Sequence, residues 1–151
     1  NEDTLTFTFK SPEVLFESGK ADLRLEYKEL LDVFFPRYMQ VLSPFKNSIN
    51  EVRIEGHTSS AWGQATDDQA YFENMRLSQG RTRAVLQYVY LLPKVHEDKG
   101  WVKKHIAAVG LSSSRLIYRD SGKENYGASR RVSFRVITNS DIQIKRILQG
   151  G

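Results

Sequence analysis

The feature that most constrains the fold is a strand that ends in a glycine and is followed, after a polar loop, by a long helix. Residues 49–55 alternate apolar and polar side chains toward their end, which is the period-two pattern of a strand, and Gly56 then allows a sharp turn. Either Asp67 or Asp68 can cap the helix that carries residues 74–90. We therefore expect this helix to pack on the sheet beside the end of the strand.

Asn74 and Arg81 are expected on one side of that helix. Residues seven apart return to within roughly 20 degrees of each other at about 100 degrees per residue. Leu77 and Ser78 lie between them. An amide and a guanidinium that face the polar end of a strand suit a carboxylate, because arginine presents paired donors in one plane. The pattern predicts a binding site.

The rest of the chain predicts one α+β domain, with its core in residues 4–138. Strands are expected at residues 4–9, 49–55, 105–109 and 131–138, and helices at residues 22–42, 67–90 and 140–149. The first strand is expected at or near an edge, and Pro36 should kink or end the first helix. The order β-α-β-α-β-β predicts a mixed four-stranded sheet with helices on one face, followed by a short C-terminal helix.

Composition excludes several classes of protein. A chain of 151 residues that is 40% hydrophobic builds one core. The apolar run at residues 85–93 is far shorter than the roughly 20 residues that span a bilayer, so any membrane attachment is expected outside this chain. The absence of cysteine excludes disulfides and suits an oxidising compartment. A net charge of +4 is too small for a nucleic-acid footprint, so no nucleic-acid partner is expected.

Catalytic and metal-binding roles are also unsupported. The three histidines, His57, His96 and His105, do not form a pair with metal-ligand spacing, and we expect His57 to be a hydrogen-bonded structural residue. Residues 110–114 lack the second glycine of a nucleophile elbow. The sequence predicts no catalytic residue, no metal and no cofactor.

Four segments in this order resemble the C-terminal domain shared by outer-membrane protein A and the flagellar stator protein MotB, the peptidoglycan-binding OmpA-like family. They are residues 16–21, 56–58, 74–81 and 129–132. The resemblance extends over about residues 14–134. It implies a non-enzymatic periplasmic domain that binds the diaminopimelate-containing stem peptide of peptidoglycan. Its parent protein would be tethered to the inner or outer membrane of a Gram-negative bacterium.

The resemblance also implies roles for single side chains. Arg81 would grip the free carboxylate of diaminopimelate, Asn74 would hydrogen-bond the same ligand, and Leu77 would form the floor of the pocket. Thr58 lies where the strand meets the loop and could contact the ligand. Neighbouring arginines alternate sides of a strand, and we assign Arg130 to the pocket.

Two departures from the family pattern affect this site. Ser59 stands where the family has an Asp that pairs with the amino group of diaminopimelate, although Ser59 itself remains a predicted ligand contact. The following loop is longer than usual and carries Asp67 and Asp68, either of which could return a carboxylate to the site, and we include Asp68 among the site residues. A third departure, Ser129 in place of the Asn that opens the final motif, leaves Arg130 and Arg131 in register.

These departures keep an alternative open. The chain could be the wall-facing domain of a MotB-like, ion-driven stator or of a Zorya-type defence complex, working as a homodimer. Its main role would then be dimerisation or contact with another protein, with weak or no binding to the wall. A basic nucleic-acid-binding domain and a wall hydrolase are less favoured alternatives.

Overall fold

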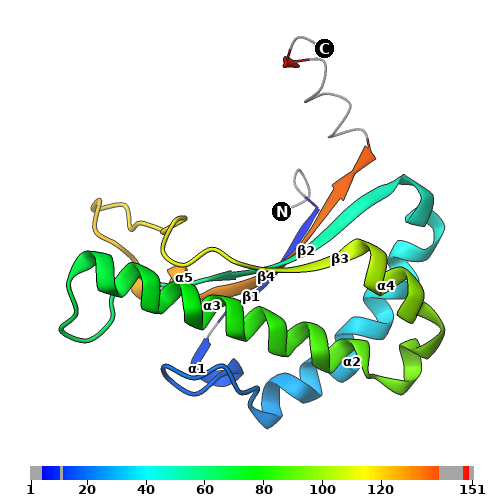
Figure 1. Ribbon diagram of the computed structural model, residues 1–151, viewed down its shortest axis with the longest axis horizontal. Coiled ribbons are helices and arrows are strands. Elements are labelled where there is room, and N and C mark those ends of the chain that lie inside the picture. Colours follow the sequence, from blue (N-terminus) through cyan, green and yellow to red (C-terminus); the bar gives the residue numbers. More distant parts are fainter. Residues whose placement is uncertain (1–4, 11, 140–147, 150–151) are drawn as a thin grey trace.

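The sheet of this protein has four strands in the order β1-β4-β2-β3. The structure, a computed structural model, describes residues 5–10, 12–139 and 148–149 (Figure 1). The strands are β1 (Thr6–Phe9), β2 (Ile49–His57), β3 (Ile106–Gly110) and β4 (Arg131–Thr138). Strand β4 pairs antiparallel with β1 and β2, whereas β3 pairs parallel with β2. The predicted mixed sheet is confirmed, and β1 lies at its edge.

Helices connect the strands and cover one face of the sheet (Figure 1). They are α1 (Pro12–Leu15), α2 (Leu25–Leu42), α3 (Asp67–Tyr90), α4 (Lys99–His105) and α5 (Tyr126–Ser129), with 3-10 turns η2 (Ser43–Ser48) and η3 (Pro93–Asp98). Pro36 lies inside α2 and does not end it, because Phe35 and Met39 on either side are buried in the core. The C-terminal helix predicted at residues 140–149 falls almost wholly outside the described residues.

Helix α3 covers the predicted residues 67–90, but the residue that caps it is not one of the two aspartates. Thr66 is its cap: the Thr66 hydroxyl accepts a hydrogen bond from the backbone of Gln69 at 3.2 Å, and the Gln69 side chain accepts one from the backbone of Thr66. Asp67 and Asp68 therefore occupy the first turn, where negative charge is favourable beside the helix N-terminus. The predicted aspartate cap was wrong by one or two positions.

The core lies between the sheet and helices α2 and α3. Phe134 of β4 is fully buried, and its ring centre lies 5.3 to 6.4 Å from those of four other aromatic residues. Val52 and Ile54 of β2 complete the inner face of the sheet. Burying a large apolar side chain contributes about 1.5–3 kcal/mol, so this aromatic layer is a main source of stability.

The opposite face of the sheet is polar around one buried carboxylate. Glu55 of β2 is only 3% exposed, and its Oε2 lies 3.6 to 3.8 Å from guanidinium groups of Arg53, Arg115 and Arg135. Arg115 comes from the loop after β3, so this cluster joins that loop to the sheet. Part of the basic charge of the chain is thereby neutralised within the fold.

Two glycines allow α3 to lie directly on the ends of β2 and β3. A Cβ atom at Gly56 would come within 2.9 Å of the carbonyl oxygen of Ser78. One at Gly110 would come within 2.7 Å of the Ser78 hydroxyl and closer still to the backbone nitrogen of Gln79. Only glycine permits this approach, which holds the first half of α3 against the end of the sheet.

Candidate functional site

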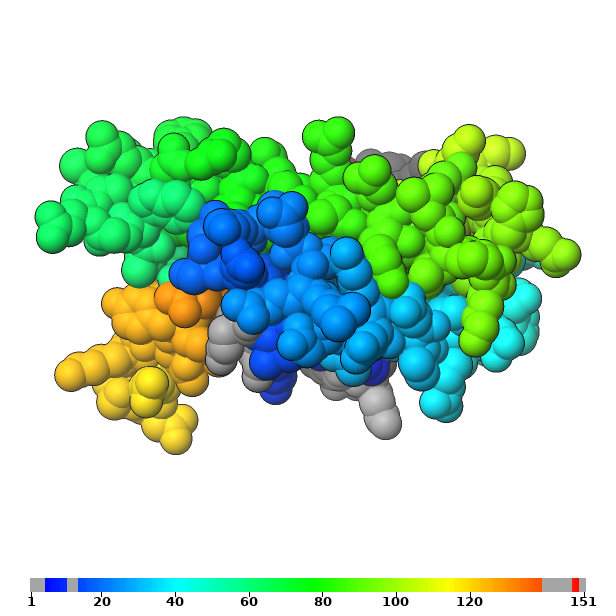
Figure 2. All heavy atoms as spheres, turned by 90° about the horizontal axis from the view of Figure 1, so that it is seen from below, coloured from blue at the N-terminus to red at the C-terminus, as the bar shows by residue number. Residues whose placement is uncertain are grey.

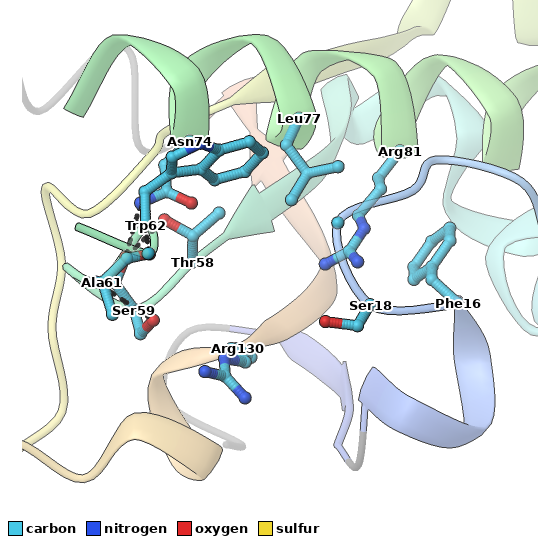
Figure 3. A pocket seen from close by; sticks show the side chains of 12 residues that line it. Phe16, Ser18, Thr58, Ser59, Ala61, Trp62, Asn74, Leu77, Arg81 and Arg130 are labelled. Atoms are coloured by element: carbon cyan, nitrogen blue, oxygen red, sulfur yellow. Dashed lines mark hydrogen bonds between the residues drawn. The ribbon is translucent and has the colours of Figure 1, made fainter. Parts of the chain in front are cut away.

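A pocket of about 340 Å³ opens at the end of the sheet beside α3. Three regions that are distant in sequence meet there: the turn after α1, the end of β2 with its loop and α3, and the junction of α5 with β4. They appear in blue, green and orange in Figure 2. The lining residues are Phe16, Ser18, Gly19, Thr58, Ser59, Ala61, Trp62, Gly63, Asn74, Leu77, Arg81 and Arg130 (Figure 3).

The structure brings six of the seven predicted site residues to this pocket. They are Thr58, Ser59, Asn74, Leu77, Arg81 and Arg130. Asp68 is not among the residues that line it. Because Thr66 caps α3, Asp67 and Asp68 both lie in the first turn with exposed side chains, and neither returns a carboxylate to the pocket.

Arg81 is a buried cation held by carbonyl groups and an aromatic ring. Its Nε donates to the carbonyl of Lys20 at 2.8 Å, and its Nη2 donates to the carbonyl of Glu17 at 3.2 Å. The guanidinium carbon lies 4.6 Å from the centre of the Phe16 ring. These contacts hold the guanidinium at the pocket wall. The residue as a whole is only 8% exposed.

Among the described residues, no carboxylate forms an ion pair with Arg81. Burial, followed by the positive charge of Arg130, lowers the pKa of Arg81 to about 10. The group therefore stays protonated at neutral pH. A buried guanidinium without a counter-ion is a strong attractor for an anionic ligand, because pairing recovers part of its lost hydration.

Asn74 shapes the pocket by holding the loop after β2. Its Nδ2 donates to the carbonyls of Ser59 and Ala61, both at 3.1 Å. The Thr58 hydroxyl donates to the same Ser59 carbonyl at 2.8 Å. The amide oxygen of Asn74 points away from these carbonyls (Figure 3), and it accepts no hydrogen bond from the described residues. Asn74 thus combines a structural role with one free acceptor at the pocket.

A second set of contacts fixes the same loop from outside the pocket. The backbone N–H and the hydroxyl of Ser60 donate to the carboxylate of Glu124 at 3.0 and 2.5 Å. The Ser112 hydroxyl donates to the carbonyl of Tyr71 at 2.6 Å, and the Ser112 carbonyl accepts from the N–H of Thr58 at 3.0 Å. The loops after β2 and β3 are therefore tied to each other and to α3.

Sequence reasoning missed Trp62 as part of the pocket. Its indole is half-buried on the pocket wall and lies beside Asn74 above Thr58 (Figure 3). A sequence signal for it was present: Trp62 is a large aromatic residue within a polar loop, and such a side chain is usually packed or in contact with a ligand. Leu77 is the helix residue that supplies apolar surface to the same pocket, and it lies outside the hydrophobic core cluster.

His57 is buried, as predicted, but its hydrogen bonding differs from the prediction. It is 5% exposed, and its Nδ1 finds no hydrogen-bond partner among the described residues. Burial, and then the charges of Arg131 and Arg115, lower its pKa to about 3, so the ring is neutral at physiological pH. In the part of the chain that the structure describes, no three acidic or histidine side chains gather into a metal-binding group.

The fold is that of a domain of the OmpA family. The sequence profile of this family matches residues 15–130, and the chain therefore belongs to it. The chain is also 52% identical over 150 residues to the Zorya protein ZorB of Escherichia coli. That alignment covers 99% of this chain and 64% of the relative, so the chain spans about 64% of the length of ZorB.

Solved structures share the fold at lower identity. The periplasmic domain of Helicobacter pylori MotB superposes with a TM-score of 0.61 at 16% identity, over 96% of this chain and 82% of that one. The cell wall anchor of the type VI secretion system (T6SS) of Pseudomonas aeruginosa gives a TM-score of 0.54 at 21% identity, over 89% of this chain and 81% of that one. These likenesses confirm the predicted α+β architecture.

Proposed function

We propose that this domain binds peptidoglycan noncovalently and so anchors its parent protein to the cell wall. The observation that carries the proposal is the buried Arg81 guanidinium, which faces the pocket and forms no ion pair with a carboxylate of the described residues. Membership of the OmpA family supports it, and so does the shared fold with a cell wall anchor of a secretion system. The proposed activity is binding alone, with no bond made or broken.

The ligand we propose is the diaminopimelate residue of the stem peptide. Its free carboxylate would pair with the N–H groups of Arg81 that remain after the two carbonyl contacts, with Arg130 adding charge at the pocket. Its aliphatic chain would lie against Leu77 and the Trp62 indole. The amide oxygen of Asn74 would accept a hydrogen bond from the ligand.

This chemistry predicts modest affinity at each site. A hydrogen bond to a charged group contributes about 1.5–3 kcal/mol, which corresponds to roughly 10- to 150-fold in the dissociation constant. Firm anchoring would then depend on several domains engaging one wall. Salt should weaken binding only partly, because buried charges are screened less than exposed ones.

Co-sedimentation with purified diaminopimelate-type peptidoglycan tests the proposal. The wild-type domain should pellet with the wall, and Arg81→Ala should remain in the supernatant. Arg83→Ala is the matched control, because Arg83 is an exposed arginine on the same helix and does not line the pocket. Pelleting that Arg81→Ala leaves unchanged would contradict the proposed site.

A second variant separates binding from folding. Arg81→Ala also removes two hydrogen bonds to the turn at residues 17–20 and could unfold that turn. Arg130 is exposed and pairs with no carboxylate among the described residues, so Arg130→Glu should preserve the fold while reversing charge at the pocket. It should reduce pelleting with an unchanged melting temperature. Full pelleting of this variant would count against an anionic ligand.

We further propose that the parent protein is the periplasmic, wall-facing subunit of a Zorya-type membrane complex. The 52% identity to ZorB over nearly the whole chain supports this reading. Within the described residues, no helix combines the length and apolarity needed to cross a bilayer, and so the proposed membrane tether is not part of the described fold. Fractionation of the full-length protein should recover it with membranes. The predicted homodimer would appear as a doubled mass in sedimentation equilibrium.

A further inference from the structure

The charge of the pocket is one-sided. Its wall carries the guanidinium groups of Arg81 and Arg130, and none of the described residues that line it has a carboxylate. Glu124, which is close in space to the loop after β2, is engaged by both donors of Ser60 and does not line the pocket. Asp68 lies exposed in the first turn of α3. Among the described lining residues, a ligand in this pocket therefore meets two positive charges and no negative one.

The side chain at the position where the family pattern has an Asp is neutral here. Ser59 is 2% exposed and lines the pocket, and the hydrogen bond that its hydroxyl accepts from the described residues is a long one, 3.4 Å from the Ala61 N–H. The amide oxygen of Asn74, which accepts no hydrogen bond from the described residues, is also uncharged. These groups can satisfy a neutral N–H, but they cannot balance an ammonium charge.

We propose that the pocket prefers diaminopimelate whose side-chain amino group is acylated, as in a cross-linked stem peptide, over diaminopimelate with a free ammonium group. This inference rests on the proposed function, because it concerns the same carboxylate held by Arg81. The amide N–H beside that carboxylate would donate to the oxygen of Asn74. The acyl group would lie against the half-buried Trp62 indole on the pocket wall.

The electrostatic reason is repulsion between the ligand ammonium and the arginines, which no carboxylate among the described lining residues offsets. In an amino-acid head group the ammonium is two bonds from the carboxylate carbon, so it would lie within several ångströms of the Arg81 guanidinium. At about 6 Å and an effective dielectric constant of about 40, between those of a protein surface and of water, one like-charge contact weakens binding by roughly tenfold. Acylation removes the charge and keeps the N–H. The domain would accordingly anchor to cross-linked wall in preference to uncross-linked peptides.

Trp62 provides a direct readout of the pocket. The chain contains two tryptophans, and Trp101 lies in α4, away from the pocket, with its ring 4.7 Å from that of His105. A Trp101→Phe background leaves Trp62 as the single fluorophore. Two ligands are titrated into it: the tripeptide L-Ala-γ-D-Glu-diaminopimelate with a free side-chain amine, and the same tripeptide acetylated at that amine.

The acetylated tripeptide should bind roughly tenfold more tightly than the free amine. Ser59→Asp should reverse this preference, because it supplies an anion for the ammonium. Ser59→Asn is the control: its side chain matches that of Asp in size but is neutral, so this variant should keep the preference for the acetylated tripeptide. Equal or tighter binding of the free amine to the Ser59 protein would overturn the inference and leave wall binding standing. If neither peptide binds but walls still pellet the domain, only the inference fails. If walls also fail to pellet it, the proposed function fails too.

Discussion

Replacing Gly110 by alanine tests how closely α3 must lie on the sheet. The new Cβ would come within 2.7 Å of the Ser78 hydroxyl and closer still to the backbone nitrogen of Gln79, whereas ordinary contacts begin near 3.4 Å. The helix must therefore retreat by about 0.7 Å or more. Overpacking of this kind costs about 1–3 kcal/mol, and we expect the upper end because backbone atoms are involved.

Urea denaturation followed by circular dichroism would measure this loss. A loss of about 3 kcal/mol corresponds to a melting temperature lower by roughly 6–12 °C for a domain of this size. Gly100→Ala is the matched control, because Gly100 lies in α4 with no atom within 4 Å of its added Cβ. Alanine there should stabilise the helix by up to about 1 kcal/mol. A free energy of unfolding for Gly110→Ala within about 0.5 kcal/mol of the wild-type value would show that α3 does not need to lie this close to the sheet.

Three further outcomes are expected. The pKa of His57 lies at about 3 when folded and near 6.5 when unfolded, so between these values the unfolded chain binds the extra proton and stability falls as pH falls. Between pH 7 and pH 5, the free energy of unfolding of the wild type, measured by urea denaturation, should fall by about 2 kcal/mol more than that of His57→Gln. The same pH dependence in both proteins would contradict this. Thr66→Ala should lower the free energy of unfolding by about 1 kcal/mol through loss of the cap. An unchanged free energy of unfolding would show that Gln69 and the two aspartates stabilise the start of α3 without the Thr66 hydroxyl. Asp68→Asn should leave wall pelleting unchanged, because its exposed side chain does not line the pocket, and a clear loss would place this carboxylate in the site.

The strands were predictable from alternation, whereas the buried faces of the helices were only partly so. Strand β4 follows the predicted bounds at both ends. In α2, however, Leu30 and Val33 are 48% and 64% exposed, while Tyr27 and Met39 are buried. Apolar residues occur all round this helix, so periodicity alone does not select a face. Packing against the aromatic layer of the sheet decides which side is buried.

Helix α3 shows why hydrophobic periodicity misses a close contact. Its buried stripe contains Asn74, Ser78 and Thr82, which are polar. The approach to Gly56 and Gly110 requires small side chains, and the hydroxyl groups find acceptors within the helix itself. A hydropathy pattern does not detect residues chosen for size.

The pocket was partly predictable because its motif residues share one helix and one strand end. Spacing predicted that Asn74 and Arg81 lie together, and the structure places both on the pocket wall. Phe16 and Trp62 reach the same wall from two loops, and only the tertiary fold brings those loops together. The position of Asp68 depended on where α3 begins, which the Thr66 cap determines.

Nuclear magnetic resonance of the Arg81 side chain would show whether this guanidinium binds the diaminopimelate carboxylate. The domain, labelled with ¹⁵N, is titrated with soluble diaminopimelate-containing muropeptides, and the guanidinium N–H signals of Arg81 are followed together with the indole N–H of Trp62. We predict that both signals shift and saturate at the same ligand concentration, while the signal of the exposed Arg83 does not move. Saturable shifts elsewhere in the domain, with Arg81 and Trp62 unperturbed, would contradict it.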